Sequence, residues 1–172
     1  MNEPARGRIA VGSDMRHDTA DSVANHLEGA GWDVVRCGAV GGPDTPWPEV
    51  AEDVARQIAE HEVDEAVVCC WTGTGVSIAA NKVPGVRAAL CRDAQTAEGA
   101  RKWNDANVLA LSLAATDAET AKEIVDAWLR VHDIDPEEAD NIDAVAALEF
   151  RYRGSAEHHS VERDPEVSAT RR

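Results

Sequence analysis

The chain has 172 residues, 44% of them apolar, which suits one globular domain with a tail and excludes wholesale disorder. No apolar run approaches the ~20 residues of a membrane-spanning helix, and the N-terminal sequence lacks the apolar stretch of a secretory signal, so we expect a cytoplasmic protein without a membrane partner. Lysine plus arginine number 17 against 32 aspartates and glutamates, and a net charge of −15 repels phosphate backbones, so we expect no nucleic-acid partner.

In chain order, short apolar runs alternate with stretches of helical apolar spacing. The run RIAVGS at 8–13 is typical of a strand, and the apolar stripe over 18–30 predicts a helix with Asp18 or Thr19 as its N-cap. A loop rich in glycine and proline precedes a helix that opens at Pro48, since proline is tolerated in a first turn. Further strands are predicted at 32–37, 65–70, 86–91 and 107–112, and further helices at 76–82, 94–103, 117–131 and 144–153.

The run EAVVCC at 65–70 has no polar alternation, which is typical of a strand buried on both faces. Five apolar strands separated by helices predict an α/β fold, a three-layer, doubly wound parallel sheet. Right-handed crossovers favour the flavodoxin-like strand order 2-1-3-4-5, with strands numbered along the chain. In that order ligands bind outside the carboxyl ends of strands 1 and 3, so functional residues are expected directly after 8–13 and 65–70.

The composition changes after the helix predicted at 117–131. An acidic stretch at 132–143 has the composition of a linker, and it leads to the predicted helix at 144–153. We therefore expect one α/β domain over 1–131. Residues 132–172 would form an acidic linker, a C-terminal helix and a polar tail that pack on the domain or on a partner subunit.

The basic residues are almost all arginine, because the only lysines are Lys82, Lys102 and Lys122. One explanation is an acidic, lysine-poor surface adapted to a high-salt habitat. The other is an ordinary acidic protein from a GC-rich genome, and both explanations stay open.

The cysteines form no C-x-x-C pair and have no histidine at a zinc-ligand spacing. Cys69 and Cys70 alternate faces in a strand, so they cannot comfortably ligate one metal together. We therefore expect no metal site. Cys37, Cys69 and Cys91 are interpreted as small buried thiols, and Cys70 is the exception.

The two loops expected at the crevice are Gly12–His17 and Trp71–Ser77. The second resembles an anion cradle, because its glycines let backbone N–H groups approach a ligand. It matches neither the P-loop nor the G-x-G-x-x-G fingerprint, so NAD is not expected. Cys70 lies at the mouth of this loop, where a stabilised thiolate can act as a base or nucleophile. The alternatives are a tight turn with a core cysteine and, for Asp14, a capping or loop carboxylate.

The run Cys70–Cys91, CWTGTGVSIAANKVPGVRAALC, resembles the ribose-5-phosphate isomerase B and galactose-6-phosphate isomerase family. Gly12–Asp14 and Asn104–Leu111 are similar to the same family. The resemblance covers roughly residues 8–130, and its long central motif makes it specific.

This resemblance implies a cofactor-free aldose–ketose isomerase that acts on a small sugar phosphate. It implies that Cys70 moves a proton between C1 and C2 through a cis-enediolate, with Thr72 beside it in the motif. It places Asp14 near the ring oxygen or hydroxyls of the sugar, and Asn104 on a sugar hydroxyl in the site of a neighbouring subunit. The N–H donors implied for the enediolate oxygen, where preorganised donors stabilise developing charge, are those of Gly73, Thr74 and Gly75.

The sequence departs from the family pattern at several site positions. The replacements are Met15, Arg92 and Trp103 for histidines, Trp71 for a glycine, Trp47 for a tyrosine and Ala114 near an arginine position. We count Trp47 among the substrate-binding residues. The proton-transfer loop is therefore kept, while much of the ring-opening and phosphate-holding set has changed.

Two explanations of these departures stay open. In the first, the substrate is different, such as a shorter or open-chain sugar phosphate that needs no ring opening, and arginines grip its phosphate by their planar fork. The candidate arginines are Arg16, Arg92, Arg151 and Arg153. In the second, the chain has lost isomerase activity and binds a sugar-like ligand or serves as a structural partner. Retention of Cys70, the glycine loop and Asn104 favours the first explanation.

Aromatic residues on the predicted helices indicate an interface. Trp103, Phe150 and Tyr152 give more aromatic surface than a small monomer needs. With the family resemblance, they predict a homodimer, or a tetramer of paired dimers, with active sites at the subunit interface. Trp32 and Trp128 are interpreted as core or interface anchors.

Overall fold

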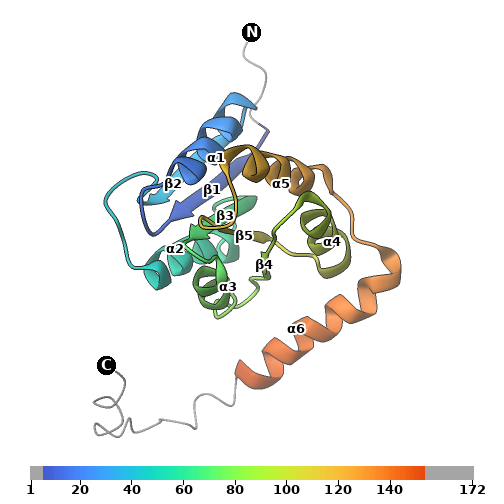
Figure 1. Cartoon of the computed structure of the whole chain (residues 1–172). Coiled ribbons are helices and arrows are strands. Elements are labelled where there is room, and N and C mark those ends of the chain that lie inside the picture. The colour runs from blue at the N-terminus through green and yellow to red at the C-terminus, as the bar shows by residue number, and fades with distance from the viewer. Residues whose placement is uncertain (1–5, 154–172) are drawn as a thin grey trace, which may run out of the picture.

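The computed structural model describes residues 6–153, which form a parallel β-sheet with helices on both faces (Figure 1). The strands are β1 (Arg8–Ser13), β2 (Asp33–Gly38), β3 (Glu65–Cys70), β4 (Ala88–Leu90) and β5 (Val108–Ser112). The helices are α1 (Asp18–Gly29), α2 (Trp47–Ala59), α3 (Thr74–Ala80), α4 (Ala94–Asn104), α5 (Ala118–Arg130) and α6 (Ala139–Arg153), with a short 3₁₀ turn, η1 (Pro136–Glu138). Among the described residues, no helix combines the length and apolar character needed to cross a membrane.

The strands lie in the order β2-β1-β3-β5-β4, and every neighbouring pair is parallel. The predicted class, a three-layer, doubly wound α/β sheet, is confirmed, but the predicted order 2-1-3-4-5 is wrong in its last two strands. β5 is buried along nearly its whole length and suits the interior of the sheet, whereas the three-residue β4 is partly exposed and suits an edge. The crossover from β3 therefore passes over β5 to reach that edge.

Side chains alternate between two hydrophobic layers, one on each face of the sheet. On one face, α1, α4 and α5 pack against residues that include Val11 and Cys69, and Trp128 of α5 is a core anchor, as predicted. On the other face, α2 and α3 pack against Val68 and Cys70. The adjacent cysteines thus belong to different layers of the core.

The first two helices begin close to their predicted starts. The N-cap of α1 is neither Asp18 nor Thr19 but His17, whose Nδ1 accepts a hydrogen bond from the Thr19 N–H at 3.2 Å. An imidazole nitrogen here accepts the hydrogen bond that a carboxylate or hydroxyl oxygen usually accepts at an N-cap. α2 begins at Trp47, so Pro48 lies in its first turn, as predicted.

β4 is shorter than the strand predicted at 86–91, because side-chain amides take the nearby backbone groups. The Asn107 side chain accepts the N–H of Arg87 at 2.8 Å. Asn81 bonds both the N–H and the carbonyl of Ala88 at 2.8 Å each. The Asn81 amide therefore covers the open side of the edge strand, so this residue of the central motif has a structural role.

Helix α6 lies outside the three layers, beneath α4 and β4 in the view of Figure 1. It starts at Ala139 rather than 144, so part of the predicted linker at 132–143 is helical. None of its residues is buried, and its Glu149 carboxylate accepts the N–H of Gly85 at 2.8 Å. The domain division after residue 131 stays a prediction, and the predicted tail over 154–172 lies outside the described residues.

Candidate active site

The crevice predicted from the topology lies between the loops that follow β1 and β3. These strands are direct neighbours, with Ser13 opposite Cys69. The chain leaves β1 for α1 on one face of the sheet and leaves β3 for α3 on the other. The two loops therefore diverge at the carboxyl end of the sheet, which is where open α/β sheets bind ligands at a switch point. β1, which Asp14 follows, and β3, which Cys70 ends, are thus neighbours in the sheet.

The Asp14 carboxyl is the polar group that follows β1. Its Oδ1 is buried and makes no hydrogen bond with any of the described residues. Burial raises the pKa of Asp14 above its ordinary value, and the nearby Asp44 carboxylate raises it further, while the N–H groups of Asp14 and Met15 partly offset both. A buried carboxylate oxygen without a donor is costly, so Asp14 is poised to accept a hydrogen bond from a ligand.

The loop that carries Asp14 is held from two directions. The Ser13 hydroxyl donates to the Met15 carbonyl at 2.7 Å, and the Asp14 carbonyl accepts the N–H of Thr45 at 3.0 Å. Asp44, next to Thr45, accepts the N–H of Arg16 at 3.2 Å. The segment between β2 and α2 therefore forms part of the site. Its glycine- and proline-rich composition predicted only a loop. Its contacts with Asp14 and Arg16 could not be predicted from the sequence.

Cys70 ends β3 with its side chain 5% exposed on the α2 and α3 face. Its carbonyl accepts the N–H groups of Gly73 at 3.2 Å and Leu113 at 3.0 Å. The carbonyl of the next residue, Trp71, accepts the N–H of Ala114 at 2.9 Å and the Ser112 hydroxyl at 3.0 Å. The backbone at Cys70 is therefore tied to the end of β5.

The other three thiols are buried structural groups. Burial raises the pKa of Cys37 to about 11 and that of Cys69 and Cys91 each to about 12. Such thiols stay protonated at neutral pH and are poor nucleophiles. Cys70 differs from them in position, because it stands where β3 meets the glycine loop.

The glycine loop is shaped by its close neighbours. Gly73 has a φ of +72°, and a β-carbon there would lie 2.9 Å from the Leu111 carbonyl oxygen, so the position requires glycine. Its N–H already donates to Cys70, which leaves Thr74 and Gly75 as the available donors. Their N–H groups lie in the first turn of α3, which its own hydrogen bonds do not use. The Thr72 and Thr74 hydroxyls are 2.7 Å apart at the entrance to this turn.

Two tryptophans border the loop. Trp47, the first residue of α2, lies against Gly75: a β-carbon at Gly75 would be 3.1 Å from Cε3 of the indole. Its side chain is still 43% exposed. Trp71, directly after Cys70, is 55% exposed. The structure thus brings Trp47 to the N–H donors, and its role as a substrate-binding residue stays a prediction.

The arginines after β1 and β4 are both exposed. Arg16 lies against the loop before α2, where its guanidinium donates to the Gly42 carbonyl at 3.4 Å. Arg92 is 89% exposed and pairs with Asp93 at 3.2 Å. Because β4 is the edge strand, β5 separates the strand before Arg92 from the strand that carries Cys70, so the adjacency implied by the predicted order is wrong. Asp93 is also the N-cap of α4, which limits how far it orients Arg92.

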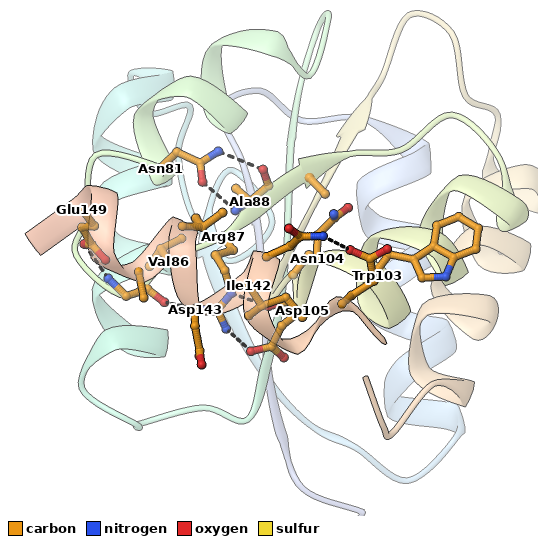
Figure 2. A pocket seen from close by; sticks show the side chains of 17 residues that line it. Asn81, Val86, Arg87, Ala88, Trp103, Asn104, Asp105, Ile142, Asp143 and Glu149 are labelled. Carbon is orange, nitrogen blue, oxygen red and sulfur yellow. Dashed lines mark hydrogen bonds and ion pairs between the residues drawn. The ribbon is translucent and has the colours of Figure 1, made fainter. Parts of the chain in front are cut away.

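Asn104, Arg151 and Arg153 do not approach Cys70 within one chain. α4 starts beyond the carboxyl end of β4 and runs back to the amino end of the strands, where Asn104 is its last residue. Asn104 lines a cavity of about 790 Å³ between this end of the sheet and α6 (Figure 2). Arg153 pairs with Glu149 on α6 at 2.9 Å. Their contact with the site of a neighbouring subunit stays a prediction.

Within residues 6–153, no group of three or more histidine, cysteine, aspartate or glutamate side chains is arranged to hold a metal ion. The expectation that the reaction needs neither metal nor cofactor stays a prediction. The groups that the crevice offers are a thiol, a carboxyl, hydroxyls and backbone N–H donors. Such groups can move protons and stabilise an oxyanion.

A family profile described as Ribose/Galactose Isomerase matches residues 9–145. Ribose-5-phosphate isomerase B of Escherichia coli strain K12 is 36% identical over 151 residues, which cover 88% of this chain and 99% of that protein. D-erythrulose-4-phosphate isomerase of Pectobacterium atrosepticum is 37% identical over 123 residues, which cover 70% of this chain and 81% of that protein.

Solved structures agree with these sequence matches. Ribose-5-phosphate isomerase B of Clostridium thermocellum superposes with a TM-score of 0.80 at 35% identity, covering 84% of this chain and 99% of that one. The enzyme of the same name from Thermotoga maritima gives a TM-score of 0.77 at 34% identity, covering 83% and 99%. The similarity therefore extends over nearly the whole length of both solved chains.

Proposed function

The chain belongs to the ribose/galactose isomerase family, and on that premise we propose that it interconverts an aldose phosphate and its ketose by moving one proton between C1 and C2. The observation that carries this proposal is Cys70, which ends β3 at the mouth of a loop whose free N–H groups can hold an oxyanion. No cofactor is needed, because the hydrogen moves as a proton and the substrate is neither oxidised nor reduced overall.

The proton transfer begins at Cys70. Its thiolate takes the proton from C2 of the aldose. The electrons of that C–H bond form the C1–C2 double bond of a cis-enediolate while the π electrons of the C1 carbonyl move to O1, which becomes the oxyanion. The same thiol returns the proton to C1, while a proton moves from O2 to O1 to give the ketose. Thr72 and Thr74, whose hydroxyls are 2.7 Å apart, can exchange the proton between these oxygens.

The negative charge that develops on the enediolate oxygen needs preorganised donors. Thr74 and Gly75 supply them, since their N–H groups point out of the first turn of α3 and Gly73 is already engaged. Donors of this kind lower a barrier because they need no reorganisation as the charge appears. Trp47 packs against Gly75 and borders these donors on one side.

Asp14 orients the sugar from the opposite loop. Its buried Oδ1 has no donor among the described residues, and a hydroxyl of the substrate would supply one. A bound sugar therefore relieves the unpaired oxygen, and this gain appears only when the substrate is in place. Asp14 would hold the hydroxyls that flank the reacting carbons.

The substrate we propose is a short sugar phosphate that enters in the open-chain form. Met15 and Arg92 occupy positions where the family pattern has ring-opening histidines. One relative of similar identity is named for D-erythrulose 4-phosphate. A four-carbon sugar phosphorylated on O4 cannot close a five-membered ring, because the oxygen that would close it is esterified. Such a substrate needs no ring-opening group.

The site is completed by a second subunit, so we propose a homodimer, or a tetramer of paired dimers, in the cytoplasm. Asn104 would bind a sugar hydroxyl in the partner's site. Arg16 and Arg92 from one subunit, or Arg151 and Arg153 from α6 of the other, would hold the phosphate. α6 carries exposed apolar side chains that suit such a contact, namely Val145, Leu148, Phe150 and Tyr152.

The test is a panel of tetrose, pentose and hexose phosphates incubated with the purified chain in deuterated water. Turnover with one deuterium incorporated at the acceptor carbon supports proton transfer through a group that exchanges with solvent. The greatest kcat/KM is expected with a tetrose phosphate. Binding of the sugar phosphates without turnover of any of them would instead favour the second explanation, a family member that binds a ligand and has lost catalysis.

A further inference from the structure

We propose that Arg87 and Asp105 are positioning residues that hold Asn104 in the orientation needed to enter the active site of a second subunit. The proposal rests on the proposed function, in which the Asn104 amide contacts the sugar. The turn between α4 and β5 lies at the amino end of the strands, whereas Cys70 lies at their carboxyl end. Neither Arg87 nor Asp105 touches the reacting atoms.

The turn after Asn104 has an unusual backbone. Asp105 is the C-cap of α4, with φ +48° and ψ +41° in the left-handed region that glycine favours. Aspartate tolerates this region better than most residues, but the conformation still needs support from its surroundings. Among non-glycine residues in the described part of the chain, only His61 and Asp105 have a positive φ.

Arg87 supplies that support through its planar fork. Its Nε donates to the Asp105 carbonyl at 2.5 Å, and its Nη2 donates to the Asp105 carboxylate at 2.7 Å. Figure 2 shows this pair beside Asn104 at the edge of the cavity. The backbone of Arg87 is itself tied to Asn107, which accepts its N–H at 2.8 Å and donates its own N–H to the Arg87 carbonyl at 3.1 Å.

A second arginine holds the next residue of the turn. Nη1 of Arg101 donates to the Ala106 carbonyl at 2.7 Å, while its Nη2 pairs with Glu65 at 2.7 Å. That ion pair is 16% and 13% exposed, and Glu65 also accepts the indole N–H of Trp128 at 2.9 Å. The turn is therefore fixed to β3 and α5 as well as to the start of β4.

Asn104 contrasts with the three residues that follow it. Its side chain is exposed, and in the described part of the chain its amide makes no hydrogen bond. Asn104 stands at the tip of an anchored turn and lines the cavity of about 790 Å³ that α6 borders on its other side. A binding group held this way loses little conformational freedom when it meets its ligand, which strengthens the contact it makes.

A purely structural role of the Arg87–Asp105 pair predicts a different dependence of activity on Asn104. If the Arg87–Asp105 pair only stabilised the turn, its loss would lower stability and reduce activity equally whether or not Asn104 is present. If the pair acts through Asn104, its loss matters only while the Asn104 amide is there. A double-mutant cycle separates the two cases.

The experiment compares the full-length chain with Asn104→Ala, Arg87→Met and the double variant, using D-erythrulose 4-phosphate or the panel member that turns over fastest. We expect each single variant to lower kcat/KM by about ten- to a hundredfold, the scale of a misplaced contact. In the Asn104→Ala background, Arg87→Met should change kcat/KM by less than about twofold. Arg36→Met is the matched control, since Arg36 is 28% exposed against 30% for Arg87 and is likewise paired with a carboxylate.

Asp105 variants keep the test decisive if Arg87→Met does not fold. Asp105→Asn retains an acceptor and tolerance of positive φ, so it should keep most of the activity, whereas Asp105→Ala should behave like Asn104→Ala. Equal losses from Arg87→Met in both backgrounds, or an unchanged kcat/KM in Arg87→Met, would overturn the proposal while leaving the isomerase function intact. No turnover by the unmodified chain would instead contradict the proposed function.

Discussion

The indole of Trp47 lies against the backbone of Gly75, so that a β-carbon on Gly75 would be 3.1 Å from Cε3 and 3.2 Å from Cδ2 of the ring. The contact joins the start of α2 to the first turn of α3. It sets the width of the crevice on the side of the N–H donors. Neither residue can change size without moving the other.

Gly75→Ala should therefore lower kcat clearly and change the free energy of unfolding only slightly. The added methyl displaces the indole by a few tenths of an ångström or shifts the donor N–H groups, and we expect a loss of about tenfold in kcat. Alanine is the better helix former, which offsets part of the strain in stability. The control is Gly29→Ala, because nothing lies within 4 Å of a β-carbon there. Unchanged kcat in Gly75→Ala would show that the donors lie elsewhere.

Cys70→Ala should abolish isomerisation and leave the fold intact. Loss of the proton-transferring group should lower kcat by about 10²–10⁴ or more. Cys69→Ala is the matched control on the neighbouring residue: it opens a small cavity in the opposite core layer, costs about 1–2 kcal/mol of unfolding free energy and spares the chemical step. Deuterium incorporation by Cys70→Ala at the rate of the unmodified chain would rule out the cysteine as base.

Asp14→Asn should make the protein more stable and less active. The pKa of Asp14 is raised in the folded state, mainly by burial, so the folded chain disfavours its ionisation. Its stabilising contribution is complete below the ordinary carboxyl pKa and is lost as pH rises through the raised value, so at neutral pH the ionised group costs stability. The neutral amide removes that cost.

The pH dependence of activity has the opposite direction to that of stability. The carboxylate is needed as an acceptor, so kcat/KM should fall as pH drops through the raised pKa of Asp14. In Asp14→Asn that acid limb should disappear at a lower overall rate. Melting temperature and kcat/KM measured between about pH 4 and 8 test both expectations. An acid limb that persists in Asp14→Asn would assign the titration to another group.

Arg92→Met should raise KM for the phosphorylated substrate by about ten- to a hundredfold, the equivalent of the ~1.5–3 kcal/mol of a charge-assisted hydrogen bond. Stability should barely change, because the pair with Asp93 is exposed. Arg130→Met is the control, since Arg130 is 64% exposed and pairs with Glu98 at the same 3.2 Å. Equal KM values in the two variants would place the phosphate on other arginines.

Cys70→Ala and Asn104→Ala should complement each other if Asn104 acts in a second subunit. Mixing Cys70→Ala with Asn104→Ala under conditions that allow subunit exchange gives hybrid dimers with one intact site each. Random pairing should restore about a quarter of the activity of the unmodified chain. Light scattering during the same experiment gives the oligomeric state. A monomer at micromolar concentration, or no gain on mixing, would contradict the shared site.

Much of this architecture could be predicted from local patterns. The apolar runs located all five strands, and the glycine loop after EAVVCC located the candidate site. The order of β4 and β5 could not be predicted, because both runs are apolar and only burial in the finished sheet shows which one needs two neighbours. The His17 cap was missed for a similar reason, since histidine is rarely the acceptor at an N-cap and Asp18 stood next to it.

The sequence predicted which loops form the candidate site, but it did not predict the contacts between distant parts of the chain. Asp14 and Cys70 were found because the topology rule places the ends of neighbouring strands together. The position of Arg92 depended on the wrong strand order. The role of Asp44 beside Asp14, and of Asp105 beside Arg87, depends on turns whose geometry has no signature in a single sequence.

The bonds from β5 to the site have a consequence for the order of assembly. The carbonyls of Cys70 and Trp71 are held by Leu113, Ala114 and Ser112, and the hydroxyl of Ser112 reaches Trp71 across 41 positions of the chain. During synthesis β3 therefore emerges with the side that pairs with β5 open, and the carbonyls of Cys70 and Trp71 lack these partners until β5 inserts beside it. Contacts of such long sequence separation form late and slowly. A nascent chain that stops short of β5 contains Asp14, Cys70 and the glycine loop, but it lacks the hydrogen bonds from Ser112, Leu113 and Ala114 that hold the backbone at Cys70 and Trp71.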